Sequence, residues 1–200
     1  MTIDVQDLLE DGYIEGVDES RVSFSGPERH GLRILDSRFT DADLSGAKLI
    51  GCRLADVELR SAHATDLSLA KSSLQDVEIV ESRIGAVQAF GGTWTRVRIV
   101  GGKIDYLNLR GTTINRLEID KAVIGDLDLS EAKVEVLNFI DTTIGKVTLT
   151  SSRTRRIDLR GARVQGLESN PEGLKGVTLG SDQVTELAPV LADILGIKVV

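Results

Sequence analysis

The chain has 200 residues, enough for one domain with a sizeable core, and its 31 acidic and 24 basic residues give a net charge of −7. This charge argues against a protein that binds bulk nucleic acid or an anionic membrane surface, because like charges repel. No apolar run approaches the roughly 20 residues of a membrane span, and the single cysteine, Cys52, excludes an intramolecular disulfide.

Residues 1–31 are expected to form an N-terminal cap segment. The opening stretch, MTIDVQDLLEDG, has neither the basic nor the apolar part of a secretory signal, so we expect a cytoplasmic protein. Apolar residues at helical spacing followed by Gly12 predict a short helix over residues 2–11. Residues 25–31, SGPERHG, have the composition of a loop that leads into the regular part of the chain.

From Ile34 to Val164 every fifth position favours a large apolar residue. Leu, Ile, Val, Phe or Trp fill 24 of these 27 positions, and the exceptions are Ala64, Ala89 and Thr154. A period of five fits neither an α-helix nor a flat strand, whose periods are about 3.6 and 2. It fits a chain that turns a corner every five residues and points one central side chain inward on each side. Stacked repeats of this kind form a solenoid.

This pattern resembles the pentapeptide-repeat family, whose motif is commonly written A(D/N)LXX. The segments that match best are ADLSG at 42–46, AKL at 47–49, LNLRG at 107–111, LDLS at 127–130 and IDLRG at 157–161. The resemblance covers residues 32–168 and implies an all-β fold, a right-handed quadrilateral β-helix in which four sides make a coil of 20 residues. We expect about seven coils, with the open strand edges at both ends covered by the flanking segments.

A second row of inward residues stands two positions before each central one. From Val57 to Leu167 this row alternates between large residues, such as Val77 and Val87, and small ones, such as Ser72. On a four-sided coil the alternation puts large residues on two opposite sides and small ones on the other two, which helps to fill a tight core. We therefore predict a slightly rectangular cross-section.

Residues 169–200 are expected to be a linker and a capping helix. The repeat ends near Asn170, and Ser181 is the predicted N-cap of the helix. Pro189 is expected to kink the helix or to split it after Leu187, and Gly196 to end it. Related pentapeptide-repeat proteins often dimerise through a C-terminal helix, so the resemblance implies a homodimer. The candidate dimer contacts are Val184, Leu187, Leu191, Ile194 and Leu195.

We find no catalytic, cofactor-binding or metal-binding pattern in the sequence. The two histidines, His30 and His63, are far apart and are expected at the surface, and Cys52 in the inward row is expected to pack as a small buried thiol. The glycine pairs at 91–92 and 101–102 lack the GxxxxGK[ST] and GxGxxG patterns of phosphate loops. We therefore expect a protein that is not an enzyme and holds no cofactor.

The best-known branch of the family consists of acidic rods that mimic B-form DNA and bind DNA gyrase, some of them conferring quinolone resistance. In this chain residues 1–31 carry a net charge of −6, residues 32–180 of +1 and residues 181–200 of −2. The neutral repeat weakens mimicry along the whole rod. A candidate partner surface remains on one side, as a carboxylate column interrupted by Arg98 and an apolar row beside it: Glu58, Glu78, Glu118, Asp158, and Val80, Val100, Ile140.

The neighbouring side changes sign along its length. Asp36, Asp56 and Asp76 stand at one corner in the first half of the repeat, and Arg96, Arg116 and Arg156 take the equivalent positions in the second half. The candidate basic end of this side consists of Arg153, Arg155 and Arg156.

Three functions are left open by these observations. The first is a non-catalytic scaffold that binds an unknown protein partner. The alternative is an acidic DNA-mimic regulator that binds DNA gyrase or a related topoisomerase. A ligand or enzymatic site in the end segments is the third, and it would need a buried cavity with perturbed carboxylates. We expect no direct nucleic-acid binding and no membrane binding.

Overall fold

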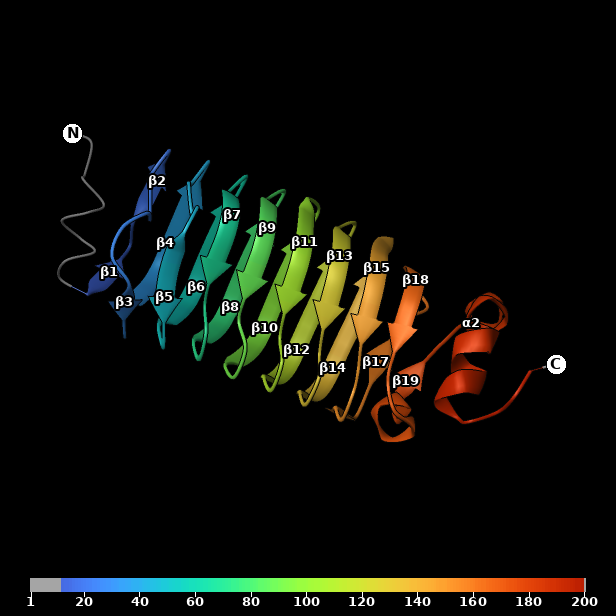
Figure 1. Cartoon of the computed structure of the whole chain (residues 1–200). Helices are drawn as coiled ribbons and strands as arrows, with labels where there is room; N and C mark the ends of the chain where they lie inside the picture. The colour runs from blue at the N-terminus through green and yellow to red at the C-terminus, as the bar shows by residue number, and fades with distance from the viewer. Residues whose placement is uncertain (1–11, 200) are drawn as a thin grey trace.

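The five-residue period builds a solenoid of parallel strands, seen in a computed structural model that describes residues 12–199 (Figure 1). β1 (Tyr13–Glu15) lies at one end of the stack and α2 (Ser181–Ile194) at the other. The helix expected over residues 2–11 lies outside the described residues. The first strands, β1 and β2 (Asp18–Ser20), already pair with the regular coils, so the ladder begins inside the segment 1–31.

Strands 20 residues apart pair in parallel and in register, as Ile34, Leu54 and Leu74 illustrate. The larger sheet has the order β1-β4-β6-β8-β10-β12-β14-β17-β19, with β2 on β4 and β16 on β14. Its remaining strands are β4 (Arg33–Thr40), β6 (Arg53–Arg60), β8 (Ser73–Val80), β10 (Thr93–Val100), β12 (Thr113–Asp120), β14 (Lys133–Ile140), β16 (Arg153–Thr154), β17 (Ile157–Asp158) and β19 (Val177–Thr178).

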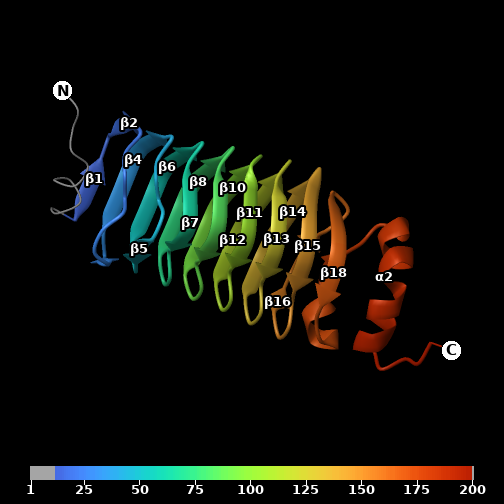
Figure 2. The same ribbon diagram turned by 45° about the horizontal axis from the view of Figure 1, so that its top comes forward.

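The smaller sheet covers another part of the coil and has the order β18-β15-β13-β11-β9-β7-β5-β3 (Figure 2). Its strands are β3 (Arg29–His30), β5 (Ala47–Ile50), β7 (His63–Ser68), β9 (Arg83–Gln88), β11 (Lys103–Asn108), β13 (Val123–Asp128), β15 (Thr142–Thr148) and β18 (Ala162–Glu168). The stack makes about eight turns, one more than expected, because strand pairing starts before residue 32. At the usual spacing of paired strands, about 4.8 Å, the stack is about 38 Å long.

Each coil has four sides that we number by their central residues. Side 1 is centred on Leu54 and its equivalents, side 2 on Leu59, side 3 on Ala64 and side 4 on Leu69. Eight-residue strands such as β6 cover sides 1 and 2, and six-residue strands such as β7 cover side 3. Side 4 ends in a turn, in which the N–H of Ser72 donates to the carbonyl oxygen of Leu69.

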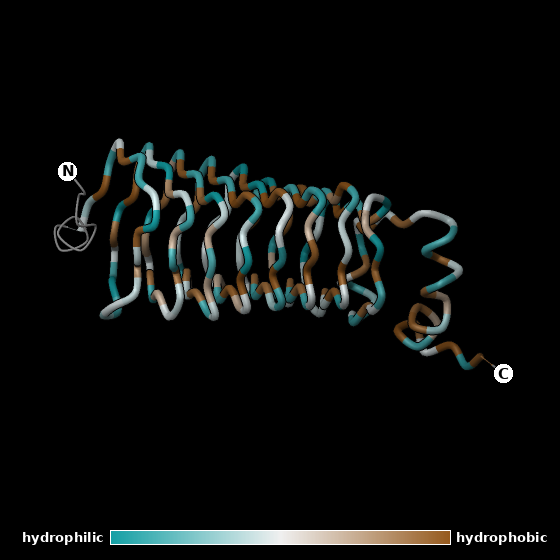
Figure 3. The backbone as a smooth tube through the Cα atoms, turned by 90° about the horizontal axis from the view of Figure 1, so that it is seen from above, coloured by the Kyte–Doolittle hydropathy of each residue, from teal (hydrophilic) through white to brown (hydrophobic). Residues whose placement is uncertain are grey.

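The core runs the length of the rod and consists of both inward rows. The central side chains of Trp94 and Ile114 are 0% and 1% exposed, and the predicted large and small residues of the second row are buried with them, as Val97 and Ala122 show. Hydrophobic and polar residues therefore alternate along the coils (Figure 3). The rectangular cross-section stays a prediction.

Hydroxyl groups in the small row satisfy backbone groups at the corners. Ser72 donates from Oγ to the carbonyl oxygen of Leu49 and accepts from the N–H of Cys52. Thr112 and Thr142 likewise donate to carbonyl oxygens one coil back. A buried hydroxyl that is hydrogen-bonded in this way costs little to bury, so serine and threonine can share this row with alanine.

The C-terminal end closes the rod. The short helix η1 (Pro171–Leu174) follows the last full coil, and α2 then packs against β18. The N-cap of α2 is Gly180, not Ser181 as predicted, because Gln183 accepts from the N–H of Gly180. The same Gln183 side chain donates to two carbonyl oxygens of the last coil, those of Leu159 and Ala162, at 2.7 Å each.

The split predicted at Pro189 is absent, and α2 is continuous through it. Pro189 has no N–H to donate to the carbonyl oxygen of Thr185 four residues earlier. Thr185 is exposed, so a water molecule can donate to this oxygen instead. Gly196 ends the helix as predicted, with φ +70°. Within residues 12–199 no helix is both long and apolar enough to cross a membrane.

Candidate interaction surfaces

The predicted carboxylates lie in one column along side 2. The pairing register places on successive coils the residues Arg38, Glu58, Glu78, Arg98, Glu118, Asn138 and Asp158. The 20-residue spacing in the sequence therefore positions these side chains correctly.

Arg98 pairs with both carboxylates in the middle of this column and offsets one of their two negative charges. Its Nη1 donates to Oε1 of Glu78 at 2.8 Å, and its Nε donates to Oε1 of Glu118 at 3.2 Å. Both carboxylates raise the pKa of the guanidinium, and the hydrogen bond that Arg98 donates to Glu78 contributes most. The arginine that interrupts the column in sequence thus joins its two neighbours into one ion-paired group.

The ends of the column are ion-paired as well. Glu58 accepts from Arg60 at 2.8 Å and from Arg38 at 3.1 Å; desolvation raises the pKa of Glu58, but the two arginines outweigh it and the net pKa is lowered. Asp158 accepts from Nη2 of Arg160 at 2.6 Å, and this hydrogen bond is the main reason its pKa is lowered. The column is therefore a ladder of ion pairs and not a free anionic stripe.

The apolar row beside the column is smaller than expected. Ile140 is 42% exposed, Val100 is half-buried and Val80 is only 8% exposed. Val80 is covered because Arg60 and Val100 flank it on the adjacent coils, so it drops out of the candidate contact surface. Asp120 stands between Val100 and Ile140, and its Oδ1 is buried without a hydrogen-bond partner among the described residues.

An acidic hollow of about 400 Å³ opens at the corner between sides 1 and 2, in the first half of the rod. It brings the corner aspartates together with the start of the carboxylate column, and its charged lining residues are Asp36, Arg38, Asp56, Glu58, Asp76 and Glu78. Asp76 is paired with Arg96, and that hydrogen bond lowers its pKa. Asp36 and Asp56 form no ion pair within residues 12–199 and remain available to a partner.

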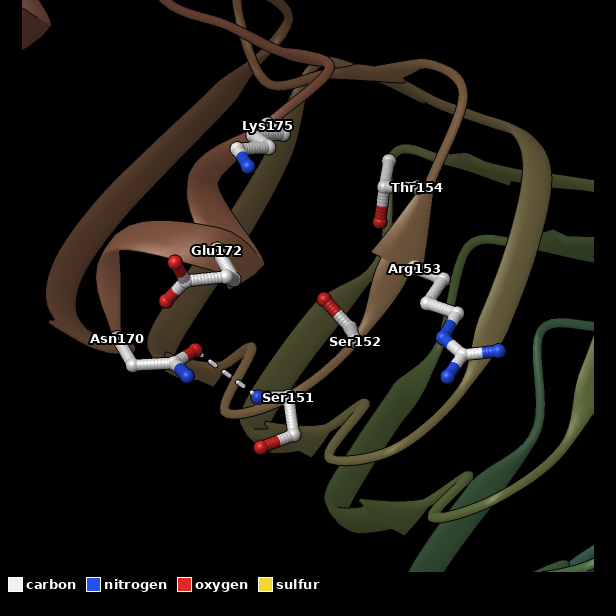
Figure 4. Close-up of a pocket in the computed structure, with 7 residues that line it drawn as sticks. All are labelled: Ser151, Ser152, Arg153, Thr154, Asn170, Glu172 and Lys175. Atoms are coloured by element: carbon white, nitrogen blue, oxygen red, sulfur yellow. Dashed lines mark hydrogen bonds between the residues drawn. The ribbon is translucent and has the colours of Figure 1, made fainter.

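The basic end lies along side 1, in the second half of the rod. Arg153 and Arg155 line a hollow of about 560 Å³ that extends back to β12. Arg153 also lines a hollow of about 480 Å³ between β16 and η1, with Ser151, Ser152, Thr154, Asn170, Glu172 and Lys175 (Figure 4). Arg155 is paired with Glu135, and Arg156 is exposed at the corner.

Sequence reasoning did not assign Asn170 or Lys175 to this region. Both lie beyond the regular repeat, where the period gives no position for a side chain. Asn170 accepts at Oδ1 from the N–H of Ser151 at 3.0 Å and so fixes the loop before η1 against the last coil (Figure 4). Only the irregular chain path after residue 168 brings Lys175 opposite Arg153.

The predicted dimer contacts divide into two groups. Leu187 is 4% exposed, and Leu191 and Ile194 pack partly buried against the core, so these three hold the cap in place. Val184 and Leu195 are 45% and 57% exposed and stay available. The helix therefore uses one face to cover the rod and leaves a few apolar side chains outside.

The remaining polar candidates are ordinary. His30 contacts Glu28 and His63 contacts Asp43 at the surface, and burial raises the pKa of the Cys52 thiol. Across the part of the chain that the structure describes, no cluster of three or more histidine, cysteine or acidic side chains could hold a metal ion. The hollows described above are open to solvent at the surface of the rod.

Comparisons with known proteins give the following similarities. A family model described as pentapeptide repeats matches residues 37–76, with eight copies. Among solved structures, a trypsin-treated form of QnrB1, a plasmid-mediated fluoroquinolone resistance protein, is 20% identical, with a TM-score of 0.36 over 94% of this chain and 97% of that one. HetL, a pentapeptide repeat protein involved in heterocyst differentiation regulation in the cyanobacterium Nostoc sp. strain PCC 7120, is 17% identical, with a TM-score of 0.28 over 84% of this chain and 87% of that one. Searching the curated proteins gave no match.

Because the identities and TM-scores are this low, we infer nothing about function from the two solved structures. The family match rests on residues 37–76, and the same register of buried central residues continues through the later coils to Val164, except at the half-buried Thr154. Residues 37–76 therefore match the pentapeptide-repeat model, and the fold of the chain is a solenoid of parallel strands like that of a pentapeptide-repeat β-helix.

Proposed function

We propose that the protein is a non-catalytic scaffold that binds another protein through the sides of the rod. The observation that carries the proposal is the separation of charge along one face. The corner between sides 1 and 2 holds Asp36 and Asp56 in its first half, which form no ion pair among the described residues, and the basic hollows of side 1 occupy the second half. A surface selected only for solubility intersperses the two signs. The proposed location is the cytoplasm, since a single buried thiol suits a reducing compartment.

Site-specific photo-crosslinking in a cell extract tests this proposal. A photoreactive amino acid at Thr113, on side 1, is expected to give a discrete adduct with another protein. The same substitution at Val123, which is 43% exposed on side 3, serves as the control and is expected to give none. Equal labelling from both positions would show that the rod has no preferred contact side.

A specific observation also favours the second candidate, a DNA-mimic regulator that binds DNA gyrase. The acidic hollow presents Asp36 and Asp56 one coil apart, a spacing of about 4.8 Å, without ion pairs within residues 12–199. Against it, the ion-pair ladder on side 2 and the basic half of side 1 limit the anionic surface to the first half of the rod.

The gyrase candidate is tested by titrating the purified protein into a supercoiling assay at two salt concentrations. Inhibition that weakens at the higher salt would support electrostatic mimicry. The matched variant is Asp36→Asn with Asp56→Asn, which is expected to abolish that inhibition. If wild-type protein leaves supercoiling unchanged at both salts, this candidate fails and the scaffold proposal stands.

We also propose that the protein forms a homodimer through α2. The exposed apolar side chains at this end of the rod are Val184, Leu195, Ile197 and Val199. Changing Val184 and Leu195 to Asp is expected to convert a dimer into a folded monomer in analytical ultracentrifugation, whereas Leu187→Asp would unseat the cap because Leu187 is buried. A wild-type protein that already sediments as a monomer would contradict the proposal.

A further inference from the structure

We propose that the second half of side 1 is a docking groove for an acidic polypeptide segment of the partner protein. This inference rests on the scaffold function proposed above and names the contact surface and the chemistry of its partner. The groove extends from β12 to η1, and its basic residues are Lys133, Arg153, Arg155 and Lys175.

The groove is continuous because its two hollows share Arg153 and Thr154. It exists because the stack of side 1 stops at β16. The next turn of chain forms η1 instead of a strand, and the N–H groups of Gly173 and Lys175 bond back to Asn170 and Glu172. Figure 4 shows β16 on one side of the resulting space, and Asn170, Glu172 and Lys175 on the other.

The cations of the groove are largely uncompensated. Within residues 12–199, Lys133, Arg153 and Lys175 form no ion pair, and Arg155 is paired with Glu135. Glu172 is the other carboxylate of the lining, so positive charge exceeds negative there. The chain as a whole has a net charge of −7, so this local excess is opposite in sign to the average.

A buried hydroxyl group in the groove is left without a partner. Thr154 takes a central position that most other coils fill with a large apolar residue. Its Oγ1 is buried and has no hydrogen-bond partner among the described residues, although the side chain lines both hollows. A buried unpaired hydroxyl costs free energy, which a polar group bound in the groove would recover once the Thr154 side chain turns its hydroxyl towards it.

The charge distribution favours a short acidic peptide over nucleic acid. A nucleic-acid duplex longer than the groove would extend along the rod towards Asp36 and Asp56, whose charge repels phosphates. An extended segment of glutamates and aspartates can place its carboxylates beside Arg153 and Lys133 and end before the acidic half. Lys133 and Arg153 are in register on adjacent coils, about 4.8 Å apart.

The test is fluorescence anisotropy with a labelled 12-residue peptide of alternating Glu and Gly, added to the full-length protein. We expect saturable binding that weakens as salt is raised. The variant Lys133→Glu with Arg153→Glu is expected to weaken binding at least tenfold. Its matched control, Arg83→Glu with Lys121→Glu, makes the same charge change at exposed side chains away from the groove, which form no ion pair among the described residues, and should change binding less than twofold.

Two further measurements make the result specific. Thr154→Val is expected to keep the protein folded by circular dichroism, because it replaces an unpaired hydroxyl by a methyl group, and to weaken the peptide several-fold. Duplex DNA of matched charge should bind more weakly than the peptide. Tighter binding of DNA, equal losses in the groove variant and its control, or no binding of the peptide would each overturn the inference. If Thr113 crosslinks to a partner but the peptide does not bind, the scaffold function is supported and only the proposal of an acidic ligand is contradicted.

Discussion

Replacing Ile114 by Asp is expected to lower the free energy of unfolding by more than about 3 kcal/mol. Ile114 is 1% exposed and stands at a central position of side 1, in register with Trp94 and Val134. A carboxylate there would be buried between two apolar neighbours, and none of the buried residues that the structure describes is a cation. The adjacent coils would also lose their packing at that point, since each coil is stabilised mainly by its neighbours.

Urea denaturation followed by circular dichroism measures the effect. The control is Lys121→Ala, at an exposed outward position, which is expected to change the free energy of unfolding by less than about 0.5 kcal/mol. Similar losses in the two variants would mean that the inward register of the repeat is assigned incorrectly.

Gly161→Ala is expected to lower the free energy of unfolding by about 2–3 kcal/mol. A Cβ atom at this position would lie 2.0 Å from the carbonyl oxygen of Phe139 and 2.8 Å from its carbonyl carbon. Both atoms belong to the backbone of the preceding coil, so no side-chain rotation can relieve the clash. The last coil would have to move away from the one before it.

The matched control is Gly180→Ala, the N-cap of α2. Its Cβ would meet no atom closer than Oε1 of Gln183 at 3.6 Å, an ordinary contact, so the cost should be a few tenths of a kcal/mol, up to about 1. The two variants are compared by thermal and urea denaturation. Equal midpoints would show that the coils around Gly161 are packed less closely than the structure has them.

The core could be predicted from the sequence because a single physical requirement repeats. Each side must bury its central residue, so the series from Ile34 to Val164 reports the register directly, and Thr154 appears as the one polar exception. Gly196 was predictable because the residue that follows a helix often takes a left-handed φ, which favours glycine.

The surface could be predicted only in part. The 20-residue spacing placed Glu78, Arg98 and Glu118 in one column, but whether neighbours in a column pair or project apart depends on side-chain conformations, which spacing does not set. The burial of Val80 likewise depends on how the side chains on adjacent coils cover it. The two hollows that share Arg153 arise where the repeat stops, and beyond that point the period carries no information.

Gln183 shows why the ends of a repeat are hard to predict. Nothing in its sequence context distinguishes it from any glutamine on an exposed helix, yet it caps α2 and bonds to two carbonyl oxygens of the last coil. Those carbonyl oxygens would otherwise have no hydrogen-bond partner where the strand ladder ends. Which side chain reaches them depends on how the cap packs on the last coil.

The central claim, that the protein acts by binding another protein through one charged face, is tested most directly by quantitative affinity capture from native extract. Four baits are compared: wild type, Asp36→Asn with Asp56→Asn, Lys133→Glu with Arg153→Glu, and the control Arg83→Glu with Lys121→Glu. The account predicts at least one protein that wild type and control retain equally and that a variant of the charged face loses. Identical sets of captured proteins on all four baits would contradict it.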